Sequence, residues 1–314
     1  MAHAIRIHAQ GGVEVLRYEE VKVGDPGPGE ARVRHTAIGV NFLDTYHRSG
    51  HYPLTMPSGI GTEAAGVVEA VGDGVDWVRP GDRVAYCTSS IGAYSTERVM
   101  AADKLVALPE GVDDRTAAAL MLKGLTVQYL FRQTFVLRGG ETVLFHAAAG
   151  GVGLIACQWA RALGVTLVGT VGSDAKAALA RENGCAHAIV YTREDFRESV
   201  REITGGRGVP VVYDSIGKDT WERSLDCLAP RGMLVYFGAS SGPIPPFDLG
   251  LLARKGSLYV TRPTLFTYAA SRSALTTMAG ELFAMVRAGK IRADVRQTWP
   301  LAAAADAHRA LESR

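Results

Sequence analysis

The stretch His146-Ala147-Ala148-Ala149-Gly150-Gly151-Val152-Gly153 decides the fold of this chain. It follows a short apolar run, Thr142–Phe145, and opens a helical pattern, Gly151–Leu163. A glycine-rich turn between a strand and a helix is the context of a dinucleotide-binding turn. Gly150 lets the backbone approach a pyrophosphate, and Gly153 lets the helix pack on the sheet. The helix N-terminus then offers free N–H groups to the phosphates.

Outward from this turn, apolar strand patterns alternate with helical ones. The alternation predicts a doubly wound parallel sheet of the α/β class, covered on both faces. It also disfavours the alternative that the turn binds no ligand. The expected strands are Thr142–Phe145, Thr166–Val171, His187–Val190, Val209–Asp214, Gly232–Phe237 and Ser257–Val260, and the expected helices are Gly151–Leu163, Ala175–Glu182, Phe196–Ile203 and Trp221–Cys227.

Before this region, residues 1–109 are β-rich, with short strand patterns separated by glycine and proline turns. We expect a compact, irregular β body or barrel there. Helical spacing also occurs in the sequence before and after the region of the parallel sheet. The strands are expected at Ala31–Ile38, Ala64–Val71 and Asp82–Tyr86, and the helices at Asp113–Leu137, Ser273–Ala288 and Ala302–Glu312.

Length and composition narrow the class of protein. At about 150 residues per domain, 314 residues predict two domains. Thirty-four basic and 32 acidic residues give a net charge of +2, which excludes a strongly basic nucleic-acid binder. Four scattered cysteines, Cys87, Cys157, Cys185 and Cys227, are typical of reduced thiols. No signal-peptide pattern and no apolar run of about 18 residues is present, so we expect a soluble, cytoplasmic protein.

The end of the second parallel strand indicates which dinucleotide is bound. An NAD site usually has Asp or Glu there to hold the ribose 2′-hydroxyl. Here Val171 is followed by Gly172 and Ser173, with Lys176 one short turn further on. Small residues leave room for a 2′-phosphate and a lysine neutralises it, which predicts NADPH. Two observations oppose this: Asp174 would repel a phosphate if it turned inward, and Lys176 fits a solvated helix position.

With these residues assembled, the chain resembles the zinc-free quinone oxidoreductases (the ζ-crystallin group) of the medium-chain dehydrogenase/reductase superfamily, and within it the bacterial NADPH:quinone reductases. The resemblance covers essentially the whole chain. It is carried by Gly140–Gly153, Asn41–Tyr46, Lys123–Thr126, Tyr213–Ser215, Phe237–Ser241 and Tyr259–Pro263.

This resemblance implies a GroES-like catalytic domain over residues 1–123, completed by 265–314, and an NADPH-binding Rossmann domain over 124–264, with the active cleft at their junction. It also implies the cofactor contacts. These are Phe42, Asp44, Thr45, Tyr46, Thr126 and Tyr129 near the nicotinamide; Gly150, Gly151, Val152 and Gly153 at the pyrophosphate; Gly172, Ser173, Lys176, Tyr191 and Arg314 at the adenosine phosphate; and Ile216, Phe237, Gly238, Ser240, Ser241, Pro263 and Leu265 on the strand-end loops.

No metal site is expected. Zinc-binding relatives carry Gly-His-Glu where this chain has Gly61-Thr62-Glu63, a catalytic cysteine near Asn41, and a four-cysteine lobe. Without His or Cys ligands at tetrahedral spacing, no zinc site can be assembled. His47 and His51 have helical spacing, but the turn at Ser49-Gly50 disfavours a shared helix face.

The expected reaction is hydride transfer from NADPH to a quinone. A quinone is a good electrophile, so the protein needs mainly to position the two rings and donate hydrogen bonds. Candidate catalytic residues are Tyr46 and Tyr52, which would stack on the quinone or bond its oxygens, with Asn41 and Arg262 near the developing charge. Either tyrosine is equally well read as a half-buried structural aromatic.

Two other functions stay open on the sequence alone. One is NADPH-dependent reduction of activated C=C bonds, as in enones, with the same fold and cofactor site. The other is an NADPH-binding protein with a regulatory role that contacts RNA, against which the near-zero net charge argues. The strand Ser257–Val260 is expected at a sheet edge, where unpaired backbone groups favour pairing with a second copy. We therefore expect a homodimer.

Overall fold

The computed structural model describes residues 1–313, which divide into two compact units. Unit 1 consists of residues 1–125, 269–287 and the chain from 292 onward, and unit 2 consists of 126–268 and 288–291. The sequence places the corresponding boundaries after residues 123 and 264, and assigns 288–291 to the other domain. Within residues 1–313, no helix is both long enough and apolar enough to cross a membrane.

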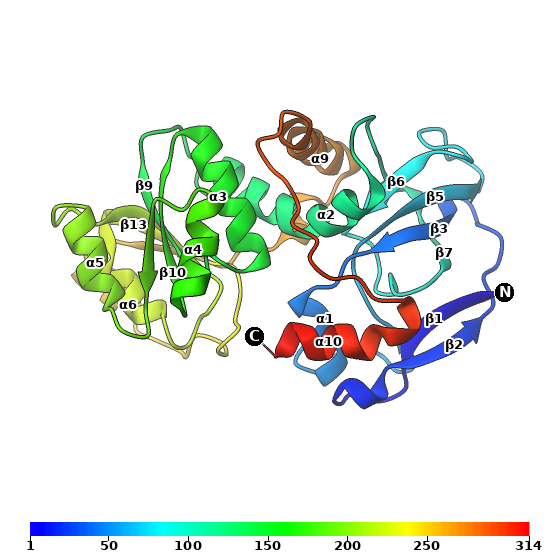
Figure 1. The fold of residues 1–314 in the computed structure, drawn as a ribbon, viewed down its shortest axis with the longest axis horizontal. Helices are drawn as coiled ribbons and strands as arrows, with labels where there is room; N and C mark the ends of the chain where they lie inside the picture. The colour runs from blue at the N-terminus through cyan, green and yellow to red at the C-terminus, as the bar shows by residue number, and fades with distance from the viewer. Residues whose placement is uncertain (314) are drawn as a thin grey trace. The chain divides into compact units, whose positions relative to one another are not determined.

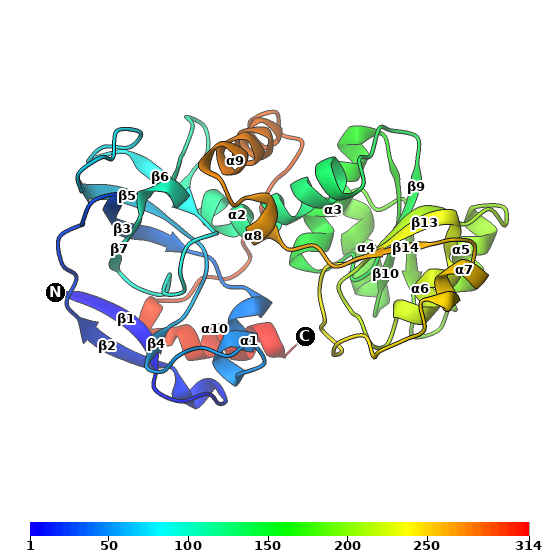
Figure 2. The same cartoon turned by 180° about the vertical axis from the view of Figure 1, so that it is seen from behind.

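Unit 2 is built on a six-stranded, all-parallel sheet in the order β11-β10-β9-β12-β13-β14 (Figures 1 and 2). This is the doubly wound order, which reverses beside β9, the first strand. The strands are β9 (Thr142–Phe145), β10 (Thr166–Val171), β11 (His187–Val190), β12 (Val209–Asp214), β13 (Leu228–Tyr236) and β14 (Tyr259–Thr261). The predicted parallel sheet is confirmed, although β13 begins earlier than expected.

The helices of unit 2 begin and end where local chemistry dictates. Ser173 caps α4 by accepting the N–H of Lys176, and Asp195 caps α5 by accepting that of Arg197. Gly164, at φ +72°, ends α3 in the left-handed conformation. The helices are α3 (Gly151–Leu163), α4 (Asp174–Glu182), α5 (Phe196–Ile203), α6 (Trp221–Asp226), α7 (Gly250–Arg254) and α8 (Leu265–Tyr268), with a π-helical turn η3 (Leu130–Thr134).

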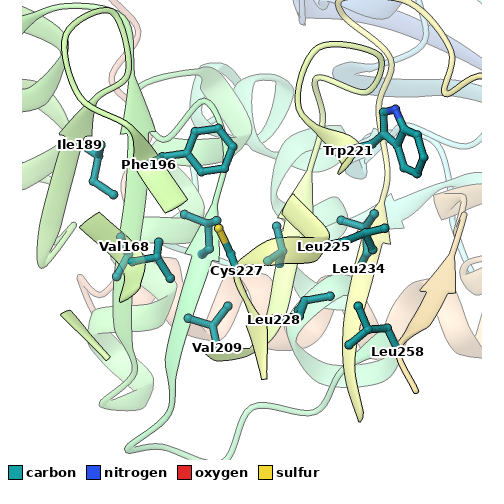
Figure 3. Close-up of a cluster of buried hydrophobic side chains, with 13 residues drawn as sticks. Val168, Ile189, Phe196, Val209, Trp221, Leu225, Cys227, Leu228, Leu234 and Leu258 are labelled. Atoms are coloured by element: carbon teal, nitrogen blue, oxygen red, sulfur yellow. The ribbon is translucent and has the colours of Figure 1, made fainter. Parts of the chain in front are cut away.

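One face of this sheet is sealed by an apolar cluster (Figure 3). Phe196 of α5 and Trp221 and Leu225 of α6 lie against strand side chains such as Val168 and Leu234. Strands buried on both faces must be apolar almost throughout, which is the pattern the sequence shows here. The cluster thus joins α5 and α6 to the strands of the sheet.

Unit 1 contains two antiparallel sheets, with strand orders β7-β3-β5-β6-β8 and β2-β1-β4. The strands are β1 (Ala2–Ile7), β2 (Arg17–Val21), β3 (Glu30–Ile38), β4 (Ser58–Gly59), β5 (Ala64–Val71), β6 (Arg83–Tyr86), β7 (Glu97–Ala101) and β8 (Val106–Ala107). The helical segments are η1 (Val13–Val15), α1 (Phe42–Ser49), η2 (Ala102–Lys104), α2 (Asp114–Tyr129, which continues into unit 2), α9 (Arg272–Arg287), η4 (Leu301–Ala303) and α10 (Ala304–Glu312).

Helix α1 is one of the elements of unit 1 that the sequence analysis missed, together with the strands β1, β2, β4, β7 and β8. Asn41 and Asp44 form a capping box at its start, and Gly50, at φ +86°, ends it. The C-terminal helix α10 lies beside α1 in both views (Figures 1 and 2), and Arg48 of α1 binds Glu312 of α10 through two hydrogen bonds of 2.7 and 3.1 Å. The end of the chain thus completes the N-terminal unit.

Candidate active site

The phosphate-binding turn joins β9 to α3 in unit 2. Gly150 caps α3 without any side-chain hydrogen bond to the first turn, so the helix N-terminus keeps N–H groups for a ligand. A Cβ at Gly153 would lie 2.6 Å from the carbonyl group of Ala148, and closer still to the carbonyl oxygen of Ala147. Only glycine fits there without moving the turn.

One residue of the turn takes a conformation that usually requires glycine. Ala147, not a glycine, takes the left-handed conformation at φ +56°, and its carbonyl accepts the N–H of Gly150 at 2.9 Å. The turn follows β9, which pairs with β10 on one side and β12 on the other. Ligands of doubly wound sheets bind beyond the carboxyl ends of the strands at this point, so the residues present fit a dinucleotide.

The segment after β10 contains the residues predicted to contact the adenosine phosphate. A Cβ at Gly172 would come within 3.1 Å of the Tyr191 hydroxyl, so the small residue lets this tyrosine lie beside the strand end. Ser173 caps α4, and Lys176 lies in the first turn of that helix. Tyr191 follows β11 and is more than half exposed. An open, uncharged strand end beside a lysine fits a 2′-phosphate.

The carboxylate that opposed this interpretation is already paired. Asp174 accepts hydrogen bonds from both terminal nitrogens of Arg193, each at 2.7 Å. The same guanidinium lowers the pKa of Asp174, so the group stays ionised but is compensated. Arg193 is a residue that sequence reasoning did not select, and its spacing from Asp174 gave no signal.

Two loops beyond β12 and β13 are joined to each other. The carbonyl groups of Ser215 and Ile216 accept the N–H groups of Ser240 (3.1 Å) and Ser241 (2.9 Å). A Cβ at Gly238 would lie 2.8 Å from the Ser215 carbonyl oxygen, so glycine is required for this approach. The structure therefore brings together, beyond the carboxyl ends of β12 and β13, the predicted residues Ile216, Phe237, Gly238, Ser240 and Ser241.

Several of the other predicted residues lie on α2, α8 and the segment after β14. Tyr129 of α2 is buried and stacks on Tyr268, with ring centroids 4.7 Å apart. Burial raises the pKa of the Tyr129 hydroxyl, so it stays protonated. Arg262 lies over the ring of Tyr236 at 4.7 Å and donates to the Pro263 carbonyl at 3.3 Å. Thr126 lies on α2 and Leu265 begins α8.

In unit 1, the predicted catalytic tyrosines belong to one aromatic group. The ring of Tyr46 lies 5.4 Å from Phe42, 5.5 Å from Tyr52 and 5.0 Å from His51, centroid to centroid. The backbone N–H of Tyr52 donates to the Tyr46 carbonyl at 3.1 Å, which fixes the segment after α1 against the helix. Edge-to-face pairs of this kind stabilise each other, so these rings form one aromatic cluster on α1 and the segment after it.

Asn41 and Asp44 begin a buried polar network that the sequence analysis did not foresee. The Asn41 side-chain amide donates to Glu63 Oε1 at 2.7 Å, and the Asn41 backbone N–H donates to Asp44 Oδ2 at 2.9 Å. Glu63 also accepts Lys123 Nζ (3.1 Å) and the N–H of Leu122 (2.6 Å). Asn41 is thereby held in a single orientation. Thr45, between Asp44 and Tyr46, donates to the Phe42 carbonyl at 2.7 Å.

The network continues through Tyr94 into the C-terminal helix. The Tyr94 hydroxyl donates to Asp44 Oδ2 at 3.0 Å and lies 3.2 Å from Nε2 of His308. Arg48 donates to the other ring nitrogen of His308 at 3.0 Å. The Asn-x-x-Asp spacing of the capping box was a readable signal for the helix, whereas the partners Tyr94 and His308 were not, because they are distant in sequence.

The remaining predicted positions concern metal binding and Arg314. Within residues 1–313, no group of three or more His, Cys, Asp or Glu side chains lies so that it could hold a metal ion. Thr62, which replaces the histidine of zinc-binding relatives, is buried with Oγ1 unpartnered among the described residues. Arg314, expected near the 2′-phosphate, lies outside the described residues.

Comparisons with known proteins place the chain in context. Residues 27–110 match the alcohol dehydrogenase GroES-like domain, and residues 151–279 match the zinc-binding dehydrogenase domain. The chain is 58% identical over 315 residues to a quinone oxidoreductase of Pseudomonas aeruginosa, with 100% of this chain and 97% of that protein covered. It is 51% identical over 324 residues to a 2-haloacrylate reductase of a Burkholderia species, with 100% and 96% covered.

A solved structure extends the comparison to a complex. The Escherichia coli quinone oxidoreductase complexed with NADPH superposes with a TM-score of 0.97 at 52% identity. The match covers 100% of this chain and 97% of that one. These findings confirm the predicted combination of a GroES-like β-rich domain with a Rossmann domain.

Proposed function

Because the chain belongs to the quinone oxidoreductases of the medium-chain dehydrogenase/reductase superfamily, we propose that it reduces quinones with NADPH. One observation carries the cofactor assignment. The second parallel strand ends at Val171 and is followed by Gly172 and Ser173 without a free carboxylate, and Asp174 is paired with Arg193. An NAD-specific site would need an acid at this strand end.

Unit 2 holds the dinucleotide in this proposal. The N-terminus of α3, at Gly151 and Val152, binds the pyrophosphate, and Lys176 and Tyr191 bind the 2′-phosphate. The joined loops after β12 and β13, together with Pro263 and Leu265, line the remainder of the cofactor. When bound, NADPH supplies the hydride and its electron pair.

Unit 1 supplies the groups that face the quinone. The ring of Tyr46 or Tyr52 positions the flat substrate, and their hydroxyls donate hydrogen bonds to its oxygens. The amide of Asn41, fixed by Glu63, is a preorganised donor for developing negative charge. One further donor comes from unit 2, since we assign the same role to the Arg262 guanidinium. Such donors act without reorganising, which is the usual source of electrostatic catalysis.

Cofactor-oxidation rates test the proposal directly. We expect turnover of 1,4-benzoquinone with NADPH and a much lower kcat/KM with NADH. The variant carrying both Tyr46→Phe and Tyr52→Phe should bind NADPH normally but turn over the quinone more slowly, because two donors are lost. Tyr18→Phe, at an exposed tyrosine of β2, is the matched control. An unchanged rate in the double variant would remove the catalytic role of these hydroxyls.

A second reaction has specific support, since one relative at 51% identity is a 2-haloacrylate reductase. Reduction of an activated C=C bond uses the same hydride donor and also needs hydrogen bonds to a carbonyl or carboxylate. Turnover of 2-chloroacrylate and of 1,4-benzoquinone should therefore be compared under identical conditions. A larger kcat/KM for the acrylate would reverse our ranking of the two substrates.

We also propose a homodimer formed through β14. This strand lies at one edge of the six-stranded sheet, and the side chain of Tyr259 on it is about half exposed. An edge strand presents unpaired backbone groups that a second copy can satisfy across a twofold axis. Sedimentation equilibrium at micromolar concentration checks this, and a monomeric mass would contradict it.

The four cysteines bear on where the protein works. Cys87, Cys157, Cys185 and Cys227 are buried free thiols. Free thiols are the usual state in a reducing compartment, and on this ground we place the protein in the cytoplasm. Fractionation of cells that express the protein would test this placement.

A further inference from the structure

Asp44 has two carboxylate oxygens with different surroundings, although the side chain is completely buried. Oδ2 accepts the N–H of Asn41 at 2.9 Å and the hydroxyl of Tyr94 at 3.0 Å. Oδ1 is buried and has no hydrogen-bond partner among the described residues. A buried charged oxygen without a donor is costly, and a proton on that oxygen removes the cost.

The hydrogen bonds around Asp44 run in one direction. An arginine can only donate, so Arg48 makes Nδ1 of His308 an acceptor. The neutral His308 ring then carries its proton on Nε2 and donates it to the Tyr94 oxygen, which frees the Tyr94 hydroxyl to donate to Asp44 Oδ2. Because Oδ2 faces two donors, a proton on Asp44 must lie on Oδ1.

The charges around Asp44 keep this proton in exchange near neutral pH. Burial is the largest influence and raises the pKa of Asp44 to about 7, and the nearby Glu63 carboxylate also raises it. The hydrogen bonds from Asn41 and Tyr94, and the Lys123 ammonium, lower it. On the side of α10, burial and the Arg48 charge lower the pKa of His308 to about 4, so that ring stays neutral; Glu312, beyond it, is paired with Arg48.

We propose that Asp44 Oδ1 holds the proton that completes reduction of the substrate, and that Tyr94 and His308 are positioning residues that keep the proton on this oxygen. The inference rests on the proposed function and deepens it. Asp44 lies on α1, between Asn41 and Tyr46, which are candidates for contact with the substrate. The carboxyl group thus belongs to the helix that carries those side chains.

The step balances without another reactant. The cofactor C–H bond breaks and its hydride supplies one hydrogen and two electrons, so the quinone is reduced and NADPH is oxidised. The O–H bond at Asp44 breaks and its proton supplies the second hydrogen of the hydroquinone. Because Oδ1 is screened from solvent, this proton passes through a hydroxyl group or water that enters with the reactants. The Asp44 carboxylate then takes back a proton from solvent through the same relay.

Infrared difference spectroscopy tests the proton on Asp44 without any turnover. In the cofactor-free wild type, the carbonyl stretch of a neutral carboxylic acid should disappear with a midpoint near pH 7 as the pH rises. Asp44→Asn keeps an oxygen for Asn41 and Tyr94 but cannot titrate, so this band should be missing. A band that is the same in the wild type and in Asp44→Asn, or a wild type that has no such band down to about pH 5, overturns the proposal.

Two further variants move the same transition in opposite directions. Tyr94→Phe removes a donor to the carboxylate and should shift the midpoint to higher pH. Glu63→Gln removes a neighbouring negative charge and should shift it to lower pH. Tyr86→Phe, which removes a buried hydroxyl bonded to His35 elsewhere in unit 1, should leave the midpoint unchanged. Shifts of the same sign in Tyr94→Phe and Glu63→Gln, or no shift in either, contradict the proposal.

The pH profile of turnover provides the second readout. Wild-type kcat with 1,4-benzoquinone should fall as the pH rises above about 7, because the donor is then deprotonated. Asp44→Asn should lower kcat by roughly 100-fold and give a flat profile. A wild type that turns over no quinone refutes the proposed function, whereas normal turnover with an unchanged profile in Asp44→Asn refutes only the role of Asp44.

Discussion

Removing the Asp44 charge should stabilise the protein, and the gain should depend on pH. The folded structure raises the pKa of this carboxyl group from 3.8 to about 7. A pKa difference of one corresponds to about 1.4 kcal/mol, so keeping Asp44 ionised in the folded state costs roughly 4 kcal/mol above neutral pH. Between the two pKa values the folded state binds more protons than the unfolded state, so stability falls as the pH rises through that window.

The expected difference can be measured between two pH values. At about pH 5 the folded group is protonated and part of the cost is absent, whereas at about pH 8 it is nearly complete. Asn cannot titrate, so the free energy of unfolding of Asp44→Asn relative to wild type should rise by roughly 3 kcal/mol between these values. Urea unfolding of the cofactor-free proteins, followed by circular dichroism, gives both differences.

A control separates this effect from a general response to pH. The hydrogen bonds from Arg197 lower the pKa of Asp195 below its usual range, so this group titrates outside the chosen window in both states. Asp195→Asn should therefore shift stability equally at both pH values. If the gap between Asp44→Asn and wild type is also the same at both, the buried carboxyl group does not titrate as we argue.

Three predictions concern the cofactor. Lys176→Ala should weaken NADPH binding roughly 10- to 100-fold in a fluorescence titration and leave NADH unchanged, because only a phosphate contact is lost. Arg193→Ala should lower the ratio of NADPH affinity to NADH affinity, because it leaves the charge of Asp174 uncompensated. Arg254→Ala, which breaks another exposed ion pair of unit 2, should leave this ratio unchanged. Equal ratios in the two variants would contradict the prediction. Gly153→Ala should abolish NADPH binding and lower the Tm, since its Cβ overlaps backbone carbonyl groups.

The parallel sheet could be predicted because the sequence patterns that specify its strands are local. Each buried strand is a short apolar run, and the bounds of Thr142–Phe145 and Thr166–Val171 agree with β9 and β10. The phosphate-binding turn was readable for the same reason, since strand, glycines and helix are contiguous. The left-handed residue was the exception, because Ala147 adopts that conformation although alanine rarely does.

The buried polar network around Asn41 and Asp44 could not be predicted. Helix α1 is short and its sequence is mostly polar or aromatic, so no apolar periodicity marks it. The orientation of Asp44 depends on Tyr94, 50 positions away, and that of Tyr94 on His308, 214 positions further on. Contacts at such separations arise from tertiary packing, and local sequence patterns do not predict them.

The pairing of Arg48 with the last helix also has a meaning for biosynthesis. These partners are 260 and 264 positions apart. At elongation rates of about 5–20 residues per second, the ribosome needs tens of seconds to make the intervening polypeptide. During that interval, in which the inserted Rossmann portion is translated, the nascent N-terminal portion lacks the residues that hold its buried arginine. The N-terminal portion can therefore finish assembling only after α10 has been made, so ribosome stalling before that point would leave it incomplete.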